Sequence, residues 1–549
     1  MVLGQTAVAN RTKTFQAAVC VLNSLQNNAA VLERLRGHQE NPGFQLQAMH
    51  GFLHRTGITV AELDKLNIIH VTGTKGKGST CAFTERILRT HGFRTGFYSS
   101  PHLVHVRERI RISGSPISKQ LFTKYFWEAY GRLEDTKDAH GGTMPFFFQF
   151  LTLLAFHVFL QERVDLAVIE VGIGGQYDCT NIIRKPWVCG ISSLGFDHCS
   201  LLGDTMEEIA WQKAGIFKPG VPALTIRQQA SPLRVLQHRA EAIRQCPLWV
   251  CPELDQYEAM VGPVILGLAG KHQRSNASLA LQLSHSWLQR YKVEERGDGL
   301  SLAQAAYTPG CPAVTFQPSA AMLKGLQETE WLGRNQILRC GSVAYYLDGA
   351  HTTASMQACV CWFRQETLQR DQTQGPGVKI LLFNTTGERD SAALLTLLVP
   401  CQFDYALFCP NITETTSSTV NHSVSVCVQH MLARCRDNQS SWQGLNATGT
   451  TNQHHRPLVT SSSSHSQVFP CILSALQWIS GREALEPAPA GLFSSSVPPQ
   501  STGLPVRLRE AGHVSVLVTG SLYLVGGVLK HLESEISTTG DHCDQSLGS

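Results

Sequence analysis

The sequence has no CxxC pair, no apolar run long enough to cross a bilayer, and little excess of charge. Its 17 cysteines are scattered, and the tightest spacing is Cys359 and Cys361, so neither a zinc site nor a disulfide framework is expected. The longest apolar stretches, 151–160 and 514–529, are too short or too interrupted for a transmembrane helix. A formal net charge of +4 gives no reason to expect a nucleic-acid partner.

The chain also lacks acidic residues at its start. The first 32 residues contain Arg11 and Lys13 but no Asp or Glu, a weak likeness to a mitochondrial presequence. Scattered thiols are typical of a reducing compartment. We therefore expect a cytoplasmic protein, with the mitochondrial matrix as the alternative for this or another amino-terminal form.

At 549 residues the chain exceeds what one hydrophobic core usually serves, so two domains are expected. Short apolar runs alternate with helical patterns, which predicts an α/β fold. We predict a P-loop ATPase-like domain with a mostly parallel sheet over residues 1–330. Its amino-terminal part, within 12–66, is predicted to form amphipathic helices. A Rossmann-like α/β domain is predicted over 331–549. The clearest strands are 68–72, 166–170, 188–192, 344–347, 379–383, 405–409 and 514–518.

The second domain contains a stretch rich in Ser, Thr, Gln, Asn and Pro at about 411–510. Such composition cannot bury much apolar surface, so most of it is predicted to be mobile loop. A single apolar run, 468–479, predicts one docked helix there.

The strongest motif lies between the strand 68–72 and a helical segment at 81–90. Its glycines allow backbone N–H groups to surround phosphate oxygens, Lys77 adds a cation, and Ser79 offers a hydroxyl to Mg²⁺. Common P-loops have four residues between the first Gly and the Gly-Lys pair, whereas this loop has two. We predict an ATP site formed by Gly73, Thr74, Lys75, Gly76, Lys77, Gly78, Ser79 and Thr80.

Polar residues follow other strands of the first domain. Glu170 ends the strand 166–170, so it can reach a metal held by Ser79, although it could instead cap a helix. His198 follows the strand 188–192 and is an equal candidate for metal ligand or ordinary polar residue. Lys213, in a helical pattern, is by default a solvated surface lysine.

The second domain repeats this arrangement. Asp348 and His351 end the strand 344–347, where they could orient a nucleophile or simply form a turn at Asp-Gly. Ser521 follows the strand 514–518, where it could contact an anion or cap a helix.

In this order the motifs resemble the folylpolyglutamate synthase family of the Mur ligase superfamily over nearly the whole chain. The resemblance rests on NIIHVTGTKGKGST from Asn67, GFYSSPHLVHVRERIRI from Gly96, VDLAVIEVGIGG from Val164, DHCSLLGDT from Asp197, WQKAGIFK from Trp211, HQRSNA from His272, WLGR from Trp331, LDGAH from Leu347 and VTGSLYLVGGVLK from Val518.

The resemblance implies a monomeric enzyme that phosphorylates the terminal γ-carboxylate of a folate with ATP and lets the amine of L-glutamate displace the phosphate. The products are folylpolyglutamates, which are retained in the cell for one-carbon metabolism. The implied cofactor is Mg²⁺, with K⁺ as a candidate activating cation. Thr352 and Thr353 depart from the residues that often follow His351 in the family, so helix entry could differ there.

Site roles implied by the resemblance are as follows. Lys77 and Ser79 contact phosphate and magnesium, Glu170 and His198 are metal ligands, and Lys213 is carbamylated. His272, Gln273 and Asn276 lie near the nucleotide. Arg334 contacts phosphate, while Asp348 and His351 serve the ligation site, with Lys77, Lys213, Asp348 and His351 as the catalytic set. Ser99, Ser100, Pro101 and His102 form a loop around the folate.

Three alternatives stay open at this stage. Dihydrofolate synthase joins glutamate to dihydropteroate with the same machinery. A noncatalytic nucleotide-binding scaffold is disfavoured because the lysines, acids and histidines of the motifs occur together. A P-loop kinase or plain ATPase leaves Asp348 and His351 without a role.

Overall fold

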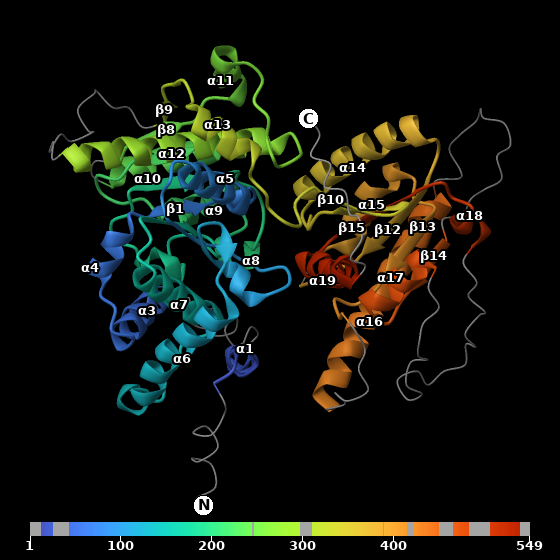
Figure 1. Cartoon of the computed structure of the whole chain (residues 1–549), viewed down its shortest axis with the longest axis horizontal. Helices are drawn as coiled ribbons and strands as arrows, with labels where there is room; N and C mark the ends of the chain where they lie inside the picture. The colour runs from blue at the N-terminus through green and yellow to red at the C-terminus, as the bar shows by residue number, and fades with distance from the viewer. Residues whose placement is uncertain are drawn as a thin grey trace, which may run out of the picture. The chain divides into compact units, whose positions relative to one another are not determined.

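The structure is a computed structural model that describes residues 13–25, 43–243, 246–296, 310–387, 389–413, 422–448, 465–481 and 505–538. It separates into two compact units, Met1–Trp331 and Leu332–Ser549. Each unit contains a mostly parallel sheet with helices packed against it (Figure 1). The predicted α/β class with two such sheets is therefore confirmed.

In the described part of the first unit, nine strands form one sheet in the order β4-β3-β2-β5-β1-β6-β7-β8-β9. Only the pairs β2/β3 and β3/β4 are antiparallel. Because β1 lies between β5 and β6, the loops that follow these three strands leave the same edge of the sheet side by side. The strands are β1 (Ile69–Thr72), β2 (Thr95–Tyr98), β3 (Ile110–Ile112), β4 (Ser115–Pro116), β5 (Leu166–Glu170), β6 (Val188–Ile191), β7 (Ala223–Thr225), β8 (Leu248–Val250) and β9 (Cys311–Pro312).

The helices of the first unit cover both faces of this sheet. Alternate residues of β5 point to opposite layers, with Val168 against α5 and α12 and Ile169 against α7. The helices are α1 (Phe15–Ser24), α3 (Phe44–Arg55), α4 (Val60–Leu63), α5 (Lys77–Thr90), α6 (Lys119–Asp135), α7 (Phe147–Gln161), α8 (Cys199–Leu202), α9 (Met206–Ala214), α10 (Ala230–Ala242), α11 (Leu254–Val261), α12 (His272–Arg296) and α13 (Ala320–Gln327).

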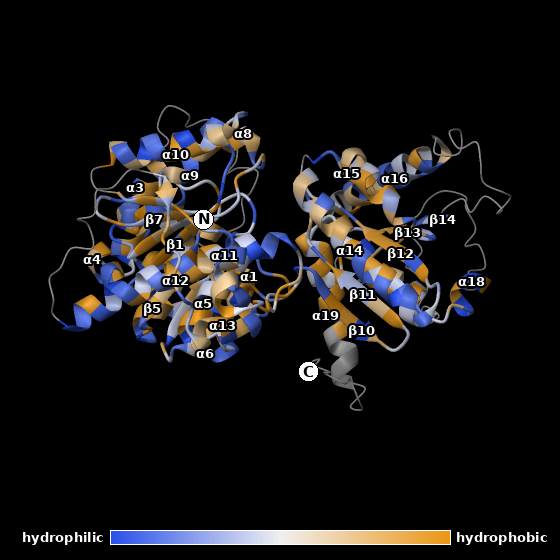
Figure 2. Ribbon diagram, turned by 90° about the horizontal axis from the view of Figure 1, so that it is seen from above, coloured by the Kyte–Doolittle hydropathy of each residue, from blue (hydrophilic) through white to orange (hydrophobic). Residues whose placement is uncertain are grey.

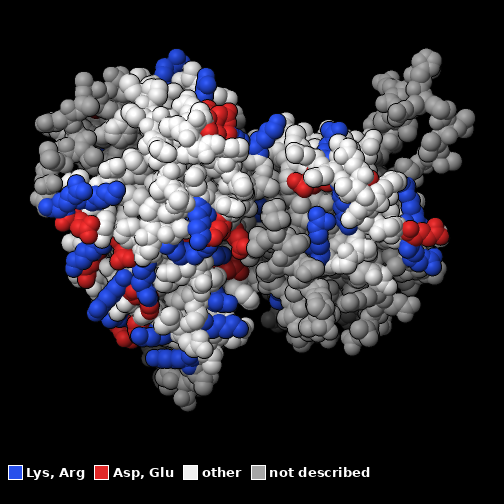
Figure 3. Space-filling model, turned by 45° about the horizontal axis from the view of Figure 1, so that its top comes forward, with Lys and Arg blue, Asp and Glu red and all other residues white. Residues whose placement is uncertain are grey.

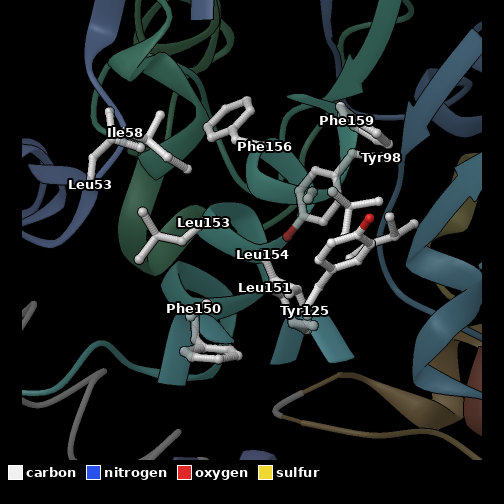
Figure 4. Packing of buried hydrophobic residues seen from close by; sticks show 14 of the residues in the cluster. Leu53, Ile58, Tyr98, Tyr125, Phe150, Leu151, Leu153, Leu154, Phe156 and Phe159 are labelled. Carbon is white, nitrogen blue, oxygen red and sulfur yellow. The ribbon is translucent and has the colours of Figure 1, made fainter. Parts of the chain in front are cut away.

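Helix α7 forms the centre of the larger core. Its residues 149–159 are all buried and most of them are apolar, as expected of a helix enclosed on every side. Phe150, Leu154 and Phe156 pack with Leu53 of α3 and Tyr98 of β2 in one cluster (Figure 4). This core packs against one face of the sheet at β2 and β5. The polar loops leave the sheet at the carboxyl ends of its strands.

In the described part of the second unit, six strands form a sheet in the order β10-β11-β15-β12-β13-β14, and only β10/β11 is antiparallel. The inner strands β12, β13 and β15 are mostly apolar and buried, as a sheet covered on both faces requires, and Figure 2 shows apolar residues in this sheet. The elements are β10 (Gln336–Cys340), β11 (Val343–Leu347), α14 (Thr353–Gln374), β12 (Val378–Phe383), α15 (Ser391–Leu398), β13 (Tyr405–Phe408), α16 (His422–Thr448), β14 (His465–Val468), α17 (Ile472–Ser480), α18 (Val506–Arg509), β15 (Val514–Thr519) and α19 (Leu522–Thr538).

The seven strands predicted from the sequence match observed strands within one residue at each end. The helix predicted at 81–90 begins four residues earlier, at Lys77. The polar stretch 411–510 was expected to hold a single helix, but α16 and the short α18 lie within its described part as well as α17. That expectation is therefore wrong for residues 422–448 and 506–509. Helix α16 docks through Cys435 and Trp442, which are buried among aromatic residues of the unit. Residues 414–421, 449–464 and 482–504 of the stretch lie outside the described residues.

No helix among the described residues combines the length and apolar character needed to cross a membrane. The face of the molecule in Figure 3 carries Lys and Arg interspersed with Asp and Glu. This mixed surface agrees with the small net charge.

Candidate active site

The phosphate loop is shorter than the motif that encodes it. Only Gly73 to Gly76 form the loop, and residues 77–80 are already the first turn of α5. Gly73 and Gly76 have φ values of 149° and 85°, which L side chains rarely adopt. A Cβ on Gly76 would lie 2.2 Å from Asn276 Oδ1, and one on Gly73 would lie 1.9 Å from Ser192 Oγ. Glycine is therefore required at both positions.

Two lysines converge on the carbonyl of Gly73. Lys77 Nζ donates to it at 3.0 Å, and Lys213 Nζ donates to it at 2.8 Å. Lys213 comes from the end of α9 and is 3% exposed, so the default expectation of a surface lysine was wrong. Burial, followed by the charge of Lys77, lowers the pKa of Lys213 well below that of an ordinary lysine.

The second lysine of the loop holds the neighbouring loop. Lys75 Nζ lies 3.0 Å from Asp197 Oδ2 in an ion pair. Asp197 precedes His198, whose backbone is left-handed at φ 54° and which immediately precedes the short helix α8. The pKa of His198 is lowered by partial burial, with Asp197 opposing and the nearby lysines adding to the effect. A neutral imidazole at this position can act as a metal ligand.

The nucleotide residues predicted on α12 reach the phosphate loop. Gln273 Nε2 donates to Ser79 Oγ at 3.4 Å, and Asn276 Nδ2 donates to Gln273 Oε1 at 2.9 Å. Both side chains are buried, whereas His272, the first residue of α12, is exposed. The structure thus brings Gln273 and Asn276 against the loop and leaves His272 exposed.

Glu170 joins the phosphate loop to the predicted folate loop. Its carboxylate is buried, and a Cβ on Gly78 would lie 3.5 Å from Glu170 Oε2. The same oxygen accepts the backbone N–H of Ser100 at 3.1 Å. The predicted loop residues Ser99 to His102 therefore begin at the carboxylate, with a cis peptide before Pro101.

His102 at the end of this loop is held by Arg109. Arg109 Nε donates to His102 Nδ1 at 2.9 Å, and the guanidinium stacks over Phe147 at 5.3 Å. Burial, together with Arg109 and His105, lowers the pKa of His102 to about 3. His102 is therefore a neutral hydrogen-bond acceptor at physiological pH.

The residues present are suitable ligands for a magnesium ion that is also bound by the phosphates of a nucleotide. No group of three or more His, Cys, Asp and Glu side chains is arranged to enclose a metal in the described part of the chain. The hydroxyl of Ser79 and the carboxylate of Glu170 are hard oxygen donors flanking Gly78. Mg²⁺ is commonly bound by one or two such donors plus phosphates and waters, so this sparse set suits it.

In the second unit, Asp348 and His351 lie where the sequence predicted, at the end of β11. Asp348 accepts backbone N–H bonds from Asn335 at 3.0 Å and Ala350 at 2.9 Å. His351 Nδ1 lies 2.7 Å from the Gly349 carbonyl, and Arg334 Nη1 donates to Gly333 at 3.2 Å. This is the turn chemistry that the sequence left open, and it fixes the acid and the imidazole at one strand end.

Helix capping, the alternative left open for Ser521, is also observed. The Ser521 hydroxyl accepts the N–H of Tyr523 at 3.2 Å at the start of α19. Thr352 caps α14 through a reciprocal bond with Ser355, so the departure from the family pattern provides a helix start rather than disturbing it.

Sequence reasoning missed a buried acid beside the site. Asp178 accepts bonds from the N–H groups of Ile173 at 3.0 Å and Thr180 at 2.9 Å, and from the Thr180 hydroxyl at 2.6 Å. Burial raises its pKa, opposed by these hydrogen bonds. The acid orders the glycine turn after Glu170. The available signal was an Asp between Gly-Gly and Thr-Asn, a local turn pattern without a distinctive chemistry.

A phosphate loop at the carboxyl edge of a parallel sheet, with lysines, a carboxylate and a hydroxyl around it, defines a nucleotide-dependent enzyme, and with the second α/β unit it has the architecture of a Mur ligase-like, ATP-dependent ligase. Solved structures agree on the fold. A folylpolyglutamate synthase from Thermotoga maritima has a TM-score of 0.59 at 22% identity, covering 95% of this chain and 97% of that one. A structure described as an FPGS–AMPPCP–folate complex has a TM-score of 0.61 at 20% identity, covering 94% and 99%.

Curated relatives identify the family. Mitochondrial folylpolyglutamate synthase of Homo sapiens is 54% identical, covering 95% of this chain and 92% of the relative. Folylpolyglutamate synthase of Saccharomyces cerevisiae is 43% identical, covering 74% and 73%. No family model matches the chain. The chain belongs to the folylpolyglutamate synthase family.

Proposed function

We propose that this chain joins L-glutamate to the γ-carboxylate of tetrahydrofolate and its glutamylated forms, with ATP converted to ADP and phosphate. The observation that carries the proposal is the phosphate loop, whose Gly73 carbonyl accepts Lys77 Nζ of α5 at 3.0 Å and Lys213 Nζ of α9 at 2.8 Å. Membership of the family supplies the substrate class. The products are folylpolyglutamates, which serve one-carbon metabolism inside the cell.

The reaction needs ATP because a carboxylate is a poor electrophile. An oxygen of the γ-carboxylate attacks the γ-phosphorus, the bond to the bridging oxygen breaks, and ADP leaves. The amine of glutamate then attacks the acyl carbon, loses a proton, and expels phosphate that carries the former carboxylate oxygen. Charge on the transferring phosphoryl group is offset by Lys77 and by backbone N–H groups at the start of α5.

Magnesium is the expected metal. Ser79 and Glu170 would hold it from α5 and β5, with His198 as a further ligand. When bound, the ion neutralises phosphate charge. K⁺ is proposed as an activating monovalent cation.

Lys213 is proposed to be carbamylated. Burial and the charge of Lys77 lower its pKa and so favour the neutral amine, which is the form that attacks carbon dioxide. The new N–C bond releases one proton and turns the neutral amine into a carboxylate-bearing group, while the nitrogen keeps one N–H for the Gly73 carbonyl. The new carboxylate is attracted by the charge of Lys77, whereas a protonated Lys213 would be repelled by it.

The remaining roles divide between the two units. Ser99, Ser100, Pro101 and His102 are proposed to order around the folate, because the Ser100 N–H already contacts the Glu170 carboxylate. Gln273 and Asn276 are proposed to face the nucleotide, with His272 at the rim of its site. Arg334, Asp348 and His351 are proposed to contact phosphate and the acyl intermediate.

The test is the mass of the product. The purified chain is incubated with ATP, Mg²⁺ and labelled glutamate, with tetrahydrofolate in one arm and dihydropteroate in the other. We expect folate lengthened by one glutamyl residue, with ADP formed in proportion. Glutamyl transfer to dihydropteroate would support dihydrofolate synthase activity instead. ATP turnover that is indifferent to added glutamate would indicate a plain ATPase.

We propose that the enzyme acts as a monomer in mitochondria and cytoplasm. The mammalian relatives are named as mitochondrial, which supports the first location. Fractionation of cells expressing the tagged full chain, with sedimentation of the purified protein, tests both statements.

A further inference from the structure

Three loops leave the edge of the first sheet beyond β1, β5 and β6. Backbone pairing ends close to this edge, with Val71 opposite Glu170 and Thr72 opposite Ile191. The loops carry different parts of the proposed site, namely the phosphate loop after β1, the glycine turn that follows Glu170, and the segment that leads to His198. Interactions between the loops are needed to keep the distances between them fixed, because loops that do not contact one another move independently.

The hydroxyl of Thr72 provides the connection on one side. Thr72 is fully buried, and its Oγ1 donates to the carbonyl of Gly174 at 2.5 Å. Gly174 lies four residues after Glu170, within the turn that Asp178 orders. Because the hydroxyl is fully buried, it contacts the turn and not a substrate.

Thr74 provides the connection on the other side. Its Oγ1 donates to the carbonyl of Gly195 at 2.9 Å and accepts the N–H of Gly195 at 3.1 Å. Gly195 lies three residues before His198, and the ion pair of Lys75 with Asp197 reinforces the same loop. The side chain is 8% exposed.

Between the two threonines, Gly73 connects the loop to the lysines. Its carbonyl accepts Lys77 and Lys213, and the Ser192 hydroxyl occupies the space where a Cβ would be. The segment 72–74 therefore joins the lysines, the turn after Glu170 and the loop before His198 through hydrogen bonds of three adjacent residues.

We infer that Thr72 and Thr74 are positioning residues that fix the spacing between the ATP phosphates and the proposed metal ligands Glu170 and His198. This inference rests on the proposed function, since it assigns the threonines a part in holding metal and phosphate together. Groups that orient metal ligands typically change metal affinity by about 10- to 100-fold when removed. A threonine that only supported the fold would change stability alone.

The experiment compares Thr72→Val, which keeps the shape and loses the hydroxyl, with Thr72→Ser, which keeps the hydroxyl. Thr84→Val is the matched control, because Thr84 is equally buried and donates to a backbone carbonyl at 2.8 Å, on α5 one turn beyond the site. ADP binding is measured by calorimetry, first with EDTA and then as Mg²⁺ is titrated. Turnover at saturating Mg²⁺ is measured alongside.

For Thr72→Val we expect ADP affinity in EDTA to stay within about twofold, while the Mg²⁺ concentration for half-maximal enhancement rises about tenfold and kcat falls. Thr72→Ser should restore both values, and Thr84→Val should leave both at the wild-type level. Should Thr72→Val not fold, Thr74→Val and Thr74→Ser repeat the comparison on the loop before His198.

If Thr72→Val and Thr74→Val match Thr84→Val in the Mg²⁺ titration, the inference is wrong. That result is distinguishable from failure of the proposed function, in which the wild-type chain itself neither ligates glutamate nor binds ADP more tightly with Mg²⁺.

Discussion

In the first unit β1 ends in a loop where two lysines converge on one carbonyl, whereas in the second unit β11 ends in a carboxylate that accepts two backbone N–H groups. Both are strand ends at the carboxyl edge of a parallel sheet. The first brings two lysine amines to one carbonyl where phosphate would bind, and the second fixes a polar turn. The difference indicates that phosphate activation depends on the first unit's electrostatics, while the second unit presents rigid polar groups.

The largest expected effect comes from Lys77→Ala. Loss of this cation should lower kcat for ligation by about 10²- to 10³-fold, the usual effect of removing one transition-state stabiliser. Circular dichroism should show the wild-type fold, because the lysine contacts only loop carbonyls at 3.0 and 3.4 Å. Retained glutamate addition in a folded variant would refute the role of the loop.

Lys213→Ala should have the next largest effect. Ligation should fall sharply and recover in part when a small carboxylic acid such as acetate or formate is added, because the acid can replace the carbamate. Activity is measured against the concentration of the acid. Lys218→Ala is the control, since Lys218 lies five residues further along the chain and its Nζ donates instead to the Asn181 carbonyl at 3.4 Å. Normal activity without rescue would exclude the carbamate.

Asp348→Asn tests the second unit. The amide keeps one acceptor but turns an N–H donor toward a backbone N–H, so stability should fall by about 1–3 kcal/mol. The measurement is the denaturation midpoint together with kcat. A loss of activity as large as that of Lys77→Ala, without loss of stability, would contradict the contrast between the two strand ends.

A smaller effect concerns pH. Burial, and then Lys218, lowers the pKa of His70 to about 3, and its Nε2 lies 3.0 Å from the Thr180 hydroxyl. Below pH about 6.5 the unfolded chain therefore binds a proton at His70 that the folded chain does not bind. The contribution of His70 to the free energy of unfolding is fully present above that pH and falls by about 1.4 kcal/mol per pH unit below it.

His70→Gln should remove this part of the acid-side slope in urea unfolding measured between pH 7 and pH 5. His54→Gln, at an exposed histidine of α3, controls for the loss of one histidine. An unchanged slope in His70→Gln would mean that another group causes the acid sensitivity.

The smallest effect is expected from Thr352→Ala. Removing the cap of α14 should lower stability by about 1 kcal/mol and leave ligation of the folded enzyme unchanged. Thr352→Ser should restore the midpoint. A selective loss of activity would show that this residue acts at the neighbouring His351.

The strands and their polar ends were predictable because covered parallel strands are short apolar runs that end at the residues of the site. Burial was not predictable where packing decides it. The sequence pattern predicts that Lys213 is a surface residue of its helix. In the folded chain it is buried and donates to the Gly73 carbonyl. The threonines that flank Gly73 carry no signal beyond their residue type.

Helix α16 was missed for a related reason. It is rich in Ser, Gln and Asn, and its docking depends on a few buried residues such as Cys435 and Trp442 rather than on a broad apolar face. Polar composition predicts loop when such contacts are not visible in the sequence. The roles of Glu170 and His198 stay predictions from motif and position.

The most direct test of the account is the fate of one oxygen. Folate labelled with ¹⁸O in its γ-carboxylate is ligated to glutamate in unlabelled water, and the released phosphate is analysed by mass spectrometry. An acyl phosphate intermediate predicts one ¹⁸O in each phosphate, because the carboxylate oxygen attacks phosphorus and departs with it. Ligated product accompanied by phosphate free of ¹⁸O would contradict the acyl phosphate and the mechanism built on it.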